Sequence, residues 1–405
     1  MVRMPLRDYR RMFAYRQVPT AMLLTFLARV PMTAMGLTLT LHIVSALGMG
    51  YGAAGLVGMM TTVGTAAAAP FIGRMLDRNG LRPVIATCTA ASATYWISAA
   101  HLTYPLLLIL ALPAGMLAVP ASPVMRQILA AIVPARLQRT AYSLDSIFIE
   151  LSFMLGPATG ILLTTQLSST IALTAIGACF GVAGTALYLV NPPIRTAGTT
   201  HLRKGERPPL RDWLTPGLAR ALILASGALF VLVGTELAAL AMLREHDQVE
   251  WTSAVIVVMC LASLAGGLTH GAVHRSLSQP TLMILLAALV VPVGLAGDPW
   301  WLLALALIPT NLMCAPTLAA GAEAISHLAP AKVRGEAMGM LDSATRLGLA
   351  IGSPAVGFVM DHSSAAWGFA AAGLGGLFIA AAAVTTGNLK PSTRDRKGEP
   401  VGSAA

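Results

Sequence analysis

Twelve apolar runs of 19 to 27 residues constrain the fold of this chain more than any other feature. A helix that crosses the hydrocarbon core of a bilayer needs about 20 mostly apolar residues. The runs lack the apolar and polar alternation of a membrane-spanning strand, so we interpret them as helices. The sequence therefore predicts an all-α polytopic membrane protein with twelve transmembrane helices. Their approximate limits are residues 19–44, 50–72, 83–101, 104–125, 140–164, 169–190, 217–243, 251–270, 279–297, 299–322, 335–360 and 366–387.

Charged residues are too few for a soluble protein of this length. Asp, Glu, Lys and Arg make up 11% of the 405 residues, whereas soluble domains carry about 25%. A chain of this size could not cover a water-facing surface with so few charges. The composition excludes an ordinary cytosolic enzyme.

The basic residues gather on one side of the predicted membrane. With the N-terminus inside, 24 of the 27 Lys and Arg residues fall in cytoplasmic loops or tails, in agreement with the positive-inside rule. Topology therefore explains the net charge of +10, and we expect no nucleic acid partner. We expect a multi-pass protein of the cell membrane with both termini in the cytoplasm. The outer loops carry Glu245, Asp247, Glu250, Asp298 and Asp361, with an interfacial belt of Trp251, Trp300, Trp301 and Trp367.

A weak internal repeat divides the chain. Residues 134–136 return at 330–332, and residues 144–146 return at 341–343, so the offset stays at 196 or 197. A constant offset predicts a tandem duplication of a six-helix unit, a known plan for transporters. We expect an N-terminal half (1–190), a cytoplasmic linker (191–216), a C-terminal half (217–387) and a cytoplasmic tail (388–405).

The segment after the second run, GRMLDRNGLR, carries a recognisable motif. It is similar to the signature G-x-L-x-D-R-x-G-R-[KR] of the major facilitator superfamily, with Gly73, Asp77, Arg78, Gly80 and Arg82 in register. The chain resembles this superfamily over essentially its whole length. The resemblance implies two pseudo-symmetric six-helix halves that alternate between inward-open and outward-open states.

The resemblance also implies a gating role for this segment, which we expect to form a loop with tight glycine turns. Asp77 would bind the positive N-terminal end of a helix in the other half and help to close the inward side. The second copy of the motif has His274 in place of Asp77 and Leu277 in place of Gly80. We therefore expect only the first copy to gate.

A second motif lies in the fifth run. Gly156-Pro157-Ala158-Thr159-Gly160 is similar to the G-P-x-x-G-G core of drug:proton antiporters in the superfamily, although Ile161 replaces the last glycine. Pro157 removes a helix hydrogen bond and Gly160 permits close approach, which predicts a flexible or kinked seam. This motif favours a drug-efflux-like transporter.

The fourth run lacks an expected feature. Proton antiporters of the family usually carry an arginine within the fourth span, but residues 104–125 contain none. The nearest arginine is Arg126, at the predicted cytoplasmic end of the run.

Six charged residues fall inside the predicted spans. Each would cost about 2.5 to 3.5 kcal/mol at the centre of a bilayer, so we expect charge pairs or a watery cavity. The six are Arg29, Asp145, Glu150, Glu236, Asp342 and Arg346.

The first and fifth spans are expected to share a charge pair. Arg29 and Glu150 lie at similar depths, so we expect them to pair at the cavity, with Asp145 as a second possible partner of Arg29. Glu150 would then respond to protons, because its protonation would release Arg29. A polar stripe on one face of the first helix accompanies this pair and consists of Arg29, Thr33, Gly36 and Thr40.

Asp342 and Arg346 are four residues apart with the acid first, which favours a pair on one helix face. Asp342 repeats Asp145, so both aspartates could have a structural duty. Every charge in the spans could instead be a static contact between helices. Glu236 could serve the cavity or the outer rim of its span.

We expect no cofactor and no metal site. His270 and His274 are four residues apart, but no Cys, Asp or Glu lies near them in sequence to complete a metal site. The four cysteines all fall within spans and are expected to be small buried apolar residues. No nucleophile with a base partner is evident, so we do not expect an enzyme.

The favoured interpretation is a secondary active transporter that acts as a monomer and exports a small, fairly apolar compound in exchange for protons, with the proton gradient as its energy source. Its partners would be the substrate, protons and the lipid bilayer. Uptake of a polar or anionic small molecule is the alternative, since Arg29 and Arg346 would suit an anion. A membrane receptor or scaffold without transport is an alternative of another class.

Overall fold

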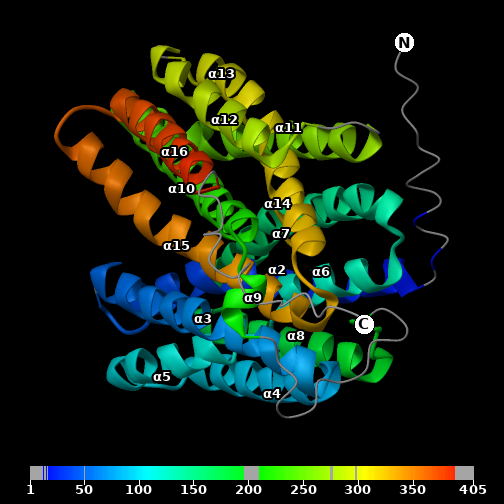
Figure 1. Ribbon diagram of the computed structural model, residues 1–405. Helices are drawn as coiled ribbons and strands as arrows, with labels where there is room; N and C mark the ends of the chain where they lie inside the picture. Colours follow the sequence, from blue (N-terminus) through cyan, green and yellow to red (C-terminus); the bar gives the residue numbers. More distant parts are fainter. Residues whose placement is uncertain are drawn as a thin grey trace, which may run out of the picture.

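Helices make up almost all of the computed structural model (Figure 1), which describes residues 12, 15, 17–49, 51–195, 209–273, 277–296 and 299–387. No strand occurs within these ranges. Several residues considered in the sequence lie outside them. They are Arg3, Arg7, Arg10, Arg11, Arg16, residues 196–208 of the linker, His274, Arg275, Asp298 and the tail 388–405.

Every predicted span coincides with a helix or with two successive helices, which confirms the predicted fold class. The first half contains α2 (Gln17–Ser45), α3 (Tyr51–Asn79), α4 (Leu81–Ala99), α5 (Tyr104–Met116), α6 (Ala121–Ile132), α7 (Ala135–Gln166) and α8 (Ser169–Val190). The second half contains α10 (Pro216–Glu245), α11 (Thr252–Ala272), α12 (Gln279–Val290), α13 (Trp300–Leu312), α14 (Cys314–Leu328), α15 (Arg334–Asp361) and α16 (Ala365–Gly387). Short elements are α9 (Leu210–Trp213), η1 (Val249–Trp251), η2 (Val291–Leu295) and η3 (Ala331–Val333).

Most of these segments could cross a membrane unaided. Within the described ranges, nine segments are long and apolar enough to do so. The helices α4, α12 and α15 fall outside that set because they are shorter or more polar, and they pack in the same bundle.

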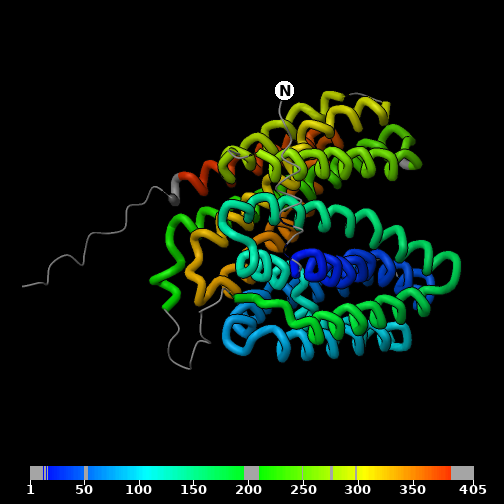
Figure 2. Tube along the Cα trace, turned by 90° about the vertical axis from the view of Figure 1, so that its right-hand side faces the viewer, coloured from blue at the N-terminus to red at the C-terminus, as the bar shows by residue number. Residues whose placement is uncertain are grey.

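The two halves form two layers. In Figures 1 and 2 the blue to cyan helices of the first half lie below the yellow to red helices of the second half. Helices α3 and α7 of the first half contact α15, α11 and α14 of the second. These five helices, together with α6, which contacts α15, form the interface between the halves.

The fourth helix of each half is broken, which corrects the prediction of one continuous span. Helix α5 ends at Met116 and α6 begins after Pro120, while α13 ends at Leu312 and α14 contains Pro316 in its first turn. Proline lacks the N–H that a continuous helix needs. The second piece also continues beyond residue 125 as far as Ile132, so Arg126 lies within α6.

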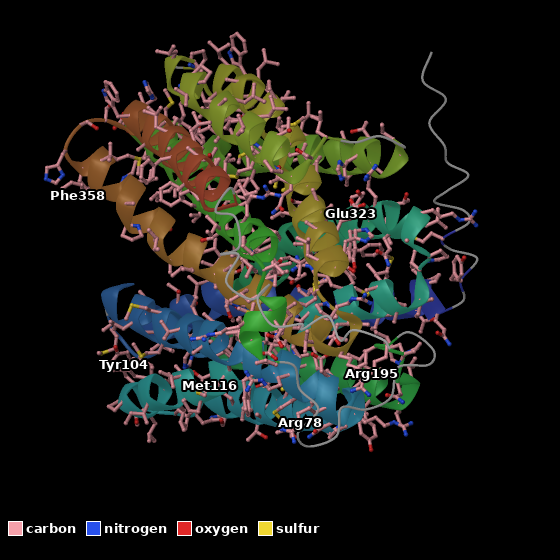
Figure 3. All side chains as sticks on the ribbon, in the orientation of Figure 1. Arg78, Tyr104, Met116, Arg195, Glu323 and Phe358 are labelled. Carbon is pink, nitrogen blue, oxygen red and sulfur yellow. The ribbon has the colours of Figure 1, made fainter. Side chains whose placement is uncertain are left out.

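The two ends of the bundle differ in composition. We call one the basic end, because its turns carry Arg78, Arg82, Arg136, Lys332 and Arg334, and the opposite one the tryptophan end, because it carries Trp251, Trp300, Trp301 and Trp367. Arg78, Arg195 and Glu323 lie toward the basic end in Figure 3, and Tyr104 and Phe358 lie at the opposite end.

One apolar core contains residues of both halves and lies toward the basic end. The core of the first half includes residues from the basic ends of α14 and α15, among them Ile325 and Met338, and the linker residue Trp213. Residues of the second half nearer the tryptophan end, such as Phe369 and Met242, form a separate core. The halves are therefore packed together at the basic end.

Candidate transport pathway and its closure

A buried aspartate lies between two arginines in the first half. Arg29 Nη1 donates to Asp145 Oδ1 at 2.7 Å, and Arg126 Nε lies 4.0 Å from Asp145 Oδ2. The three residues are 4%, 2% and 8% exposed, respectively, for Arg29, Asp145 and Arg126. The expected pair of Arg29 with Glu150 is therefore wrong, and the second possible partner, Asp145, binds Arg29.

The helix geometry of α7 explains the partner of Arg29. Glu150 lies five positions after Asp145, so their side chains point about 140° apart around the helix axis. Asp145 faces α2, whereas Glu150 Oε1 accepts hydrogen bonds from Ser263 Oγ of α11 at 2.9 Å and Cys314 Sγ of α14 at 3.3 Å. Glu150 thus connects the two halves.

A second charge pair lies on α15. Arg346 Nε donates to Asp342 Oδ2 at 2.9 Å, as the spacing of four residues predicts. Asp342 also interacts electrostatically with Arg126 across the interface. Charges of alternating sign therefore connect Arg29, Asp145, Arg126, Asp342 and Arg346.

Two glutamates in the interior have no basic partner. Glu150 and Glu236 form no ion pair within the described ranges, and each interacts electrostatically with the other and with Cys260. No group of three or more His, Cys, Asp or Glu side chains that could hold a metal ion occurs among the described residues. The interior therefore contains two carboxyl groups without a basic partner among the described residues.

Two small cavities lie along the pathway in the described part of the chain. Two cavities of about 30 and 20 Å³ lie between the first half and α15. Both are lined by Met32, Thr65, Ala118 and Arg346. Cavities of this size hold little more than water.

The predicted seam along the fifth span packs against the first span. Thr33 Oγ1 donates to the Ser152 carbonyl at 2.7 Å. A Cβ at Gly156 would overlap Thr33 Oγ1, and one at Gly160 would lie 2.5 Å from Thr38 Oγ1. Helix α7 continues through Pro157 without interruption. Both glycines therefore permit close approach of α2 and α7.

The motif that resembles a gating loop is largely helical, which corrects the expectation of a loop. Residues 73–79 form the last turns of α3, and only Gly80, with φ of 80°, makes the turn into α4. Gly73 permits close helix contact instead of a turn, because a Cβ there would meet the Gly335 backbone.

Asp77 binds the N-terminus of α15. Its Oδ1 accepts the Gly335 N–H at 2.9 Å and its Oδ2 accepts the Glu336 N–H at 2.8 Å. These N–H groups have no acceptor within the helix, and the helix dipole favours an anion there. The contact with a helix of the other half that the resemblance implies for Asp77 is thus present.

Further contacts join α3 to α15 beside Asp77, and we call this set of contacts the first seal. Arg74 Nη2 donates to Glu336 Oε1 at 2.9 Å, and Ser343 Oγ donates to the Ala66 carbonyl at 2.6 Å. A Cβ at Gly339 would lie 2.8 Å from the carbonyl carbon of Ala69. The first seal therefore runs from Asp77 to Ser343.

The other motif residues hold the turn in place. Arg82 Nε donates to the Tyr188 carbonyl at 3.3 Å, and Arg78 is exposed. Arg195, at the start of the linker, donates to the Leu76 carbonyl at 3.1 Å and to the Asp77 carbonyl. Partial burial lowers the pKa of Arg195, and the negative charge of Asp77 opposes that shift.

A second set of contacts, which we call the second seal, joins α7 to α11 and α14. The sequence predicts gating only by the first copy of the motif, at residues 73–82. Thr140 Oγ1 donates to the Gly271 carbonyl at 2.7 Å. Arg139 Nε donates to Glu323 Oε2 at 3.3 Å, and its Nη1 donates to the Val273 carbonyl at 3.4 Å. The contact of α7 with α11 and α14 is therefore formed by side chains of Arg139, Thr140 and Glu323, which do not belong to the motif.

Comparison with known protein families gives a match over most of the chain. The sequence profile described as Major Facilitator Superfamily matches residues 21–297 and 277–403. Comparison with curated protein sequences gives no significant match.

Three solved structures share the fold. The human organic anion transporter MFSD10 (TETRAN) is 18% identical, with a TM-score of 0.71 over 91% of this chain and 99% of that one. A bacterial homologue of the iron transporter ferroportin in an outward-facing state is 12% identical, with a TM-score of 0.71 over 91% and 98%. The proton:xylose symporter XylE is 12% identical, with a TM-score of 0.72 over 91% and 95%. At these identities the likeness concerns the fold alone.

Proposed function

Because the chain belongs to the Major Facilitator Superfamily, it is a secondary transporter, and we propose that it exports a small, fairly apolar compound in exchange for protons. The proposed cycle is alternating access by a monomer in the cell membrane, with the basic end and both termini in the cytoplasm. The proton gradient supplies the energy, without a cofactor.

The position of Glu150 carries this proposal. Its carboxylate lies between the halves and accepts hydrogen bonds from Ser263 and Cys314 of the other half. A carboxylate in such a place is a candidate proton site, because hydrogen bonds to the charged form are lost or weakened when it is protonated. Protonation would therefore loosen the contact of α7 with α11 and α14 and lessen the repulsion between Glu150 and Glu236.

The state of the bundle corresponds to one step of the proposed cycle. With the basic end in the cytoplasm, the two seals close the inward side. In an exporter this state releases substrate outward and admits protons. The glycine seam of α2 and α7 at Gly156 and Gly160, similar to the motif of drug:proton antiporters, supports export.

The lining of the small cavities supports an apolar substrate. Met32, Met35 and Met116 line them. Methionine side chains are flexible and polarizable, so they adapt to apolar ligands of different shapes.

Transport of an organic anion is the second candidate. Arg29 Nε and Nη2 are buried and have no hydrogen-bond partner within the described ranges. The human neighbour is named an organic anion transporter. Against this candidate, Asp145 binds Arg29 and Asp342 binds Arg346.

Proteoliposomes with an imposed pH gradient test both candidates. Fluorescent neutral, cationic and anionic compounds serve as substrates, and Glu150→Gln is compared with wild type. We expect wild type to move a neutral or cationic compound against its gradient and Glu150→Gln to lose the dependence on pH. Glu250→Gln, an exposed residue at the tryptophan end, is the matched control.

Each result has a definite meaning. Full gradient-driven transport by Glu150→Gln would show that another group couples protons. Transport of the anionic compound alone would favour the second candidate. Absence of any flux, together with a co-purifying soluble protein, would support a receptor or scaffold.

A further inference from the structure

A cavity of about 380 Å³ lies at the basic end, apart from the small interior cavities. It lies where the turn between α6 and α7 meets the end of α14 and the start of α15. These turns contain the repeated segments 134–136 and 330–332. The first of these turns lines the cavity, together with residues on either side of the second turn, which are Ser326, His327 and Arg334.

Arg334 supplies a positive charge to this cavity. It is the first residue of α15, and its Nε is buried without a hydrogen-bond partner within the described ranges. Two other arginines at the basic end form ion pairs, Arg74 with Glu336 and Arg139 with Glu323. Arg334 forms no ion pair with an acid in the part of the chain that the structure describes.

Other polar groups in the lining suit an anion. Gln138, Ser326 and His327 line the cavity, and Ser326 is 3% exposed. The first turn of α7, at Pro134 and Ala135, also lines it. The N-terminal amides of this long helix have no acceptor in their own helix and favour negative charge.

The neighbouring acid of α14, Glu323, is already engaged. Glu323 Oε2 accepts from Arg139 Nε at 3.3 Å, and Glu323 Oε1 lies 3.9 Å from His327 Nε2. Glu323 does not line the cavity. The charge facing the cavity is therefore positive.

We propose that this cavity is a regulatory phosphate site, which binds inorganic phosphate or the phosphate group of an anionic lipid. Arginine suits phosphate because its guanidinium can donate two parallel hydrogen bonds to phosphate oxygens. Arg334 and Ser326 come from the second half, whereas Gln138 and the first turn of α7 come from the first half. A bound phosphate bridges the halves and stabilises the closed basic end, since separation of the halves would dismantle the site.

Binding is tested on the purified full chain in detergent after lipid removal. Equilibrium dialysis with radiolabelled inorganic phosphate, at constant ionic strength in chloride, measures affinity. We expect Arg334→Gln to weaken phosphate binding by about tenfold or more, because it removes a charge-assisted contact. Arg334→Lys should weaken binding by less, because lysine keeps the positive charge. Lys332→Gln, which removes an exposed charge two residues away and outside the lining, should bind as wild type does.

A second arm identifies the source of the phosphate. Each variant is placed in phosphatidylcholine nanodiscs with or without phosphatidic acid, and thermal unfolding is compared. Stabilisation by phosphatidic acid that is lost in Arg334→Gln, without binding of inorganic phosphate, assigns a lipid headgroup. Binding of inorganic phosphate assigns a free phosphate.

The proposal is overturned if neither source binds, or if Arg334→Gln and Lys332→Gln bind alike. The unfolding temperature of Arg334→Gln without phosphate shows whether that variant is folded. The effect of phosphate on gating rests on the proposed function, whereas the measurement of phosphate binding does not. Phosphate binding and the proposed transport function can therefore be refuted separately. If the site regulates transport, phosphate inside proteoliposomes that face the basic end should slow flux by wild type and not by Arg334→Gln.

Discussion

Arg29 Nη1 and Asp145 Oδ1 are 2.7 Å apart in the interior of the first half, with Arg126 on the other side of the same carboxylate. The group holds two positive charges and one negative charge. The aspartate therefore stabilises both arginines in a region with little access to water.

Replacement of Asp145 by Asn should destabilise the protein severely. Removal of one partner from a buried ion pair costs about 3 to 5 kcal/mol, because the remaining charge stays buried without compensation. We expect a clear drop in the thermal unfolding temperature in detergent. Asp212→Asn, on an exposed helix of the linker, is the control. Equal unfolding temperatures for the two variants would contradict the structural duty of Asp145.

Loss of the Asp77 charge should open the basic end. Asp77→Asn weakens two hydrogen bonds to a charged acceptor, each worth about 1.5 to 3 kcal/mol. We expect the population with an open basic end to rise by about tenfold or more. Distances between spin labels on the basic ends of α3 and α15 measure this population. The exposed neighbour Asn79→Ala should leave it unchanged, and a closed basic end in Asp77→Asn would refute the gating role.

Replacement of Gly335 by Ala should also raise the population with an open basic end, because the added methyl group does not fit in the first seal. A Cβ at Gly335 would lie 2.6 Å from the Gly73 carbonyl oxygen and would also overlap the Asp77 carboxylate. Overpacking of this kind costs about 1 to 3 kcal/mol, and only the closed state bears it. Gly357→Ala is the matched control on the same helix, since its nearest neighbour would lie 3.8 Å away. The label distances should change in Gly335→Ala and stay the same in Gly357→Ala.

The second seal should depend on Arg139 and Glu323 as a pair. Single replacements by Gln should each increase the open population, and the double replacement should do so by less than the sum of both. Contacting residues show interaction free energies of about 0.5 to 3 kcal/mol in such cycles. Arg136→Gln, an exposed arginine of the same helix, is the control. Strict additivity of the two changes would mean that the pair contributes nothing to closure.

The twelve helices could be predicted from sequence because a bilayer imposes a length requirement on each run separately. Apolar composition does not predict the breaks in the fourth helix of each half, because it does not distinguish one helix from two. Arg126 was placed at a membrane end for the same reason. Its helix continues through a protein interior, where Asp145 balances the charge.

Depth in the membrane is not enough to predict which acid pairs with Arg29. Arg29 and Glu150 lie at similar depths, but the helical angle between Asp145 and Glu150 directs only Asp145 toward α2. That angle can be read from sequence and shows that only one of the two acids can face α2. The second seal could not be found from the motif, because Thr140 and Arg139 lie on α7, outside the motif and its second copy.

The donors to Asp77 are main-chain N–H groups, and this has a consequence for genetics. Any residue except proline offers the same donor at position 336, so the bond can be removed by ordinary substitution only from the Asp77 side. A screen for suppressors of Asp77→Asn should therefore not recover a simple exchange of charges between the two positions. Suppressors should instead map to contacts that favour closure elsewhere, such as the second seal.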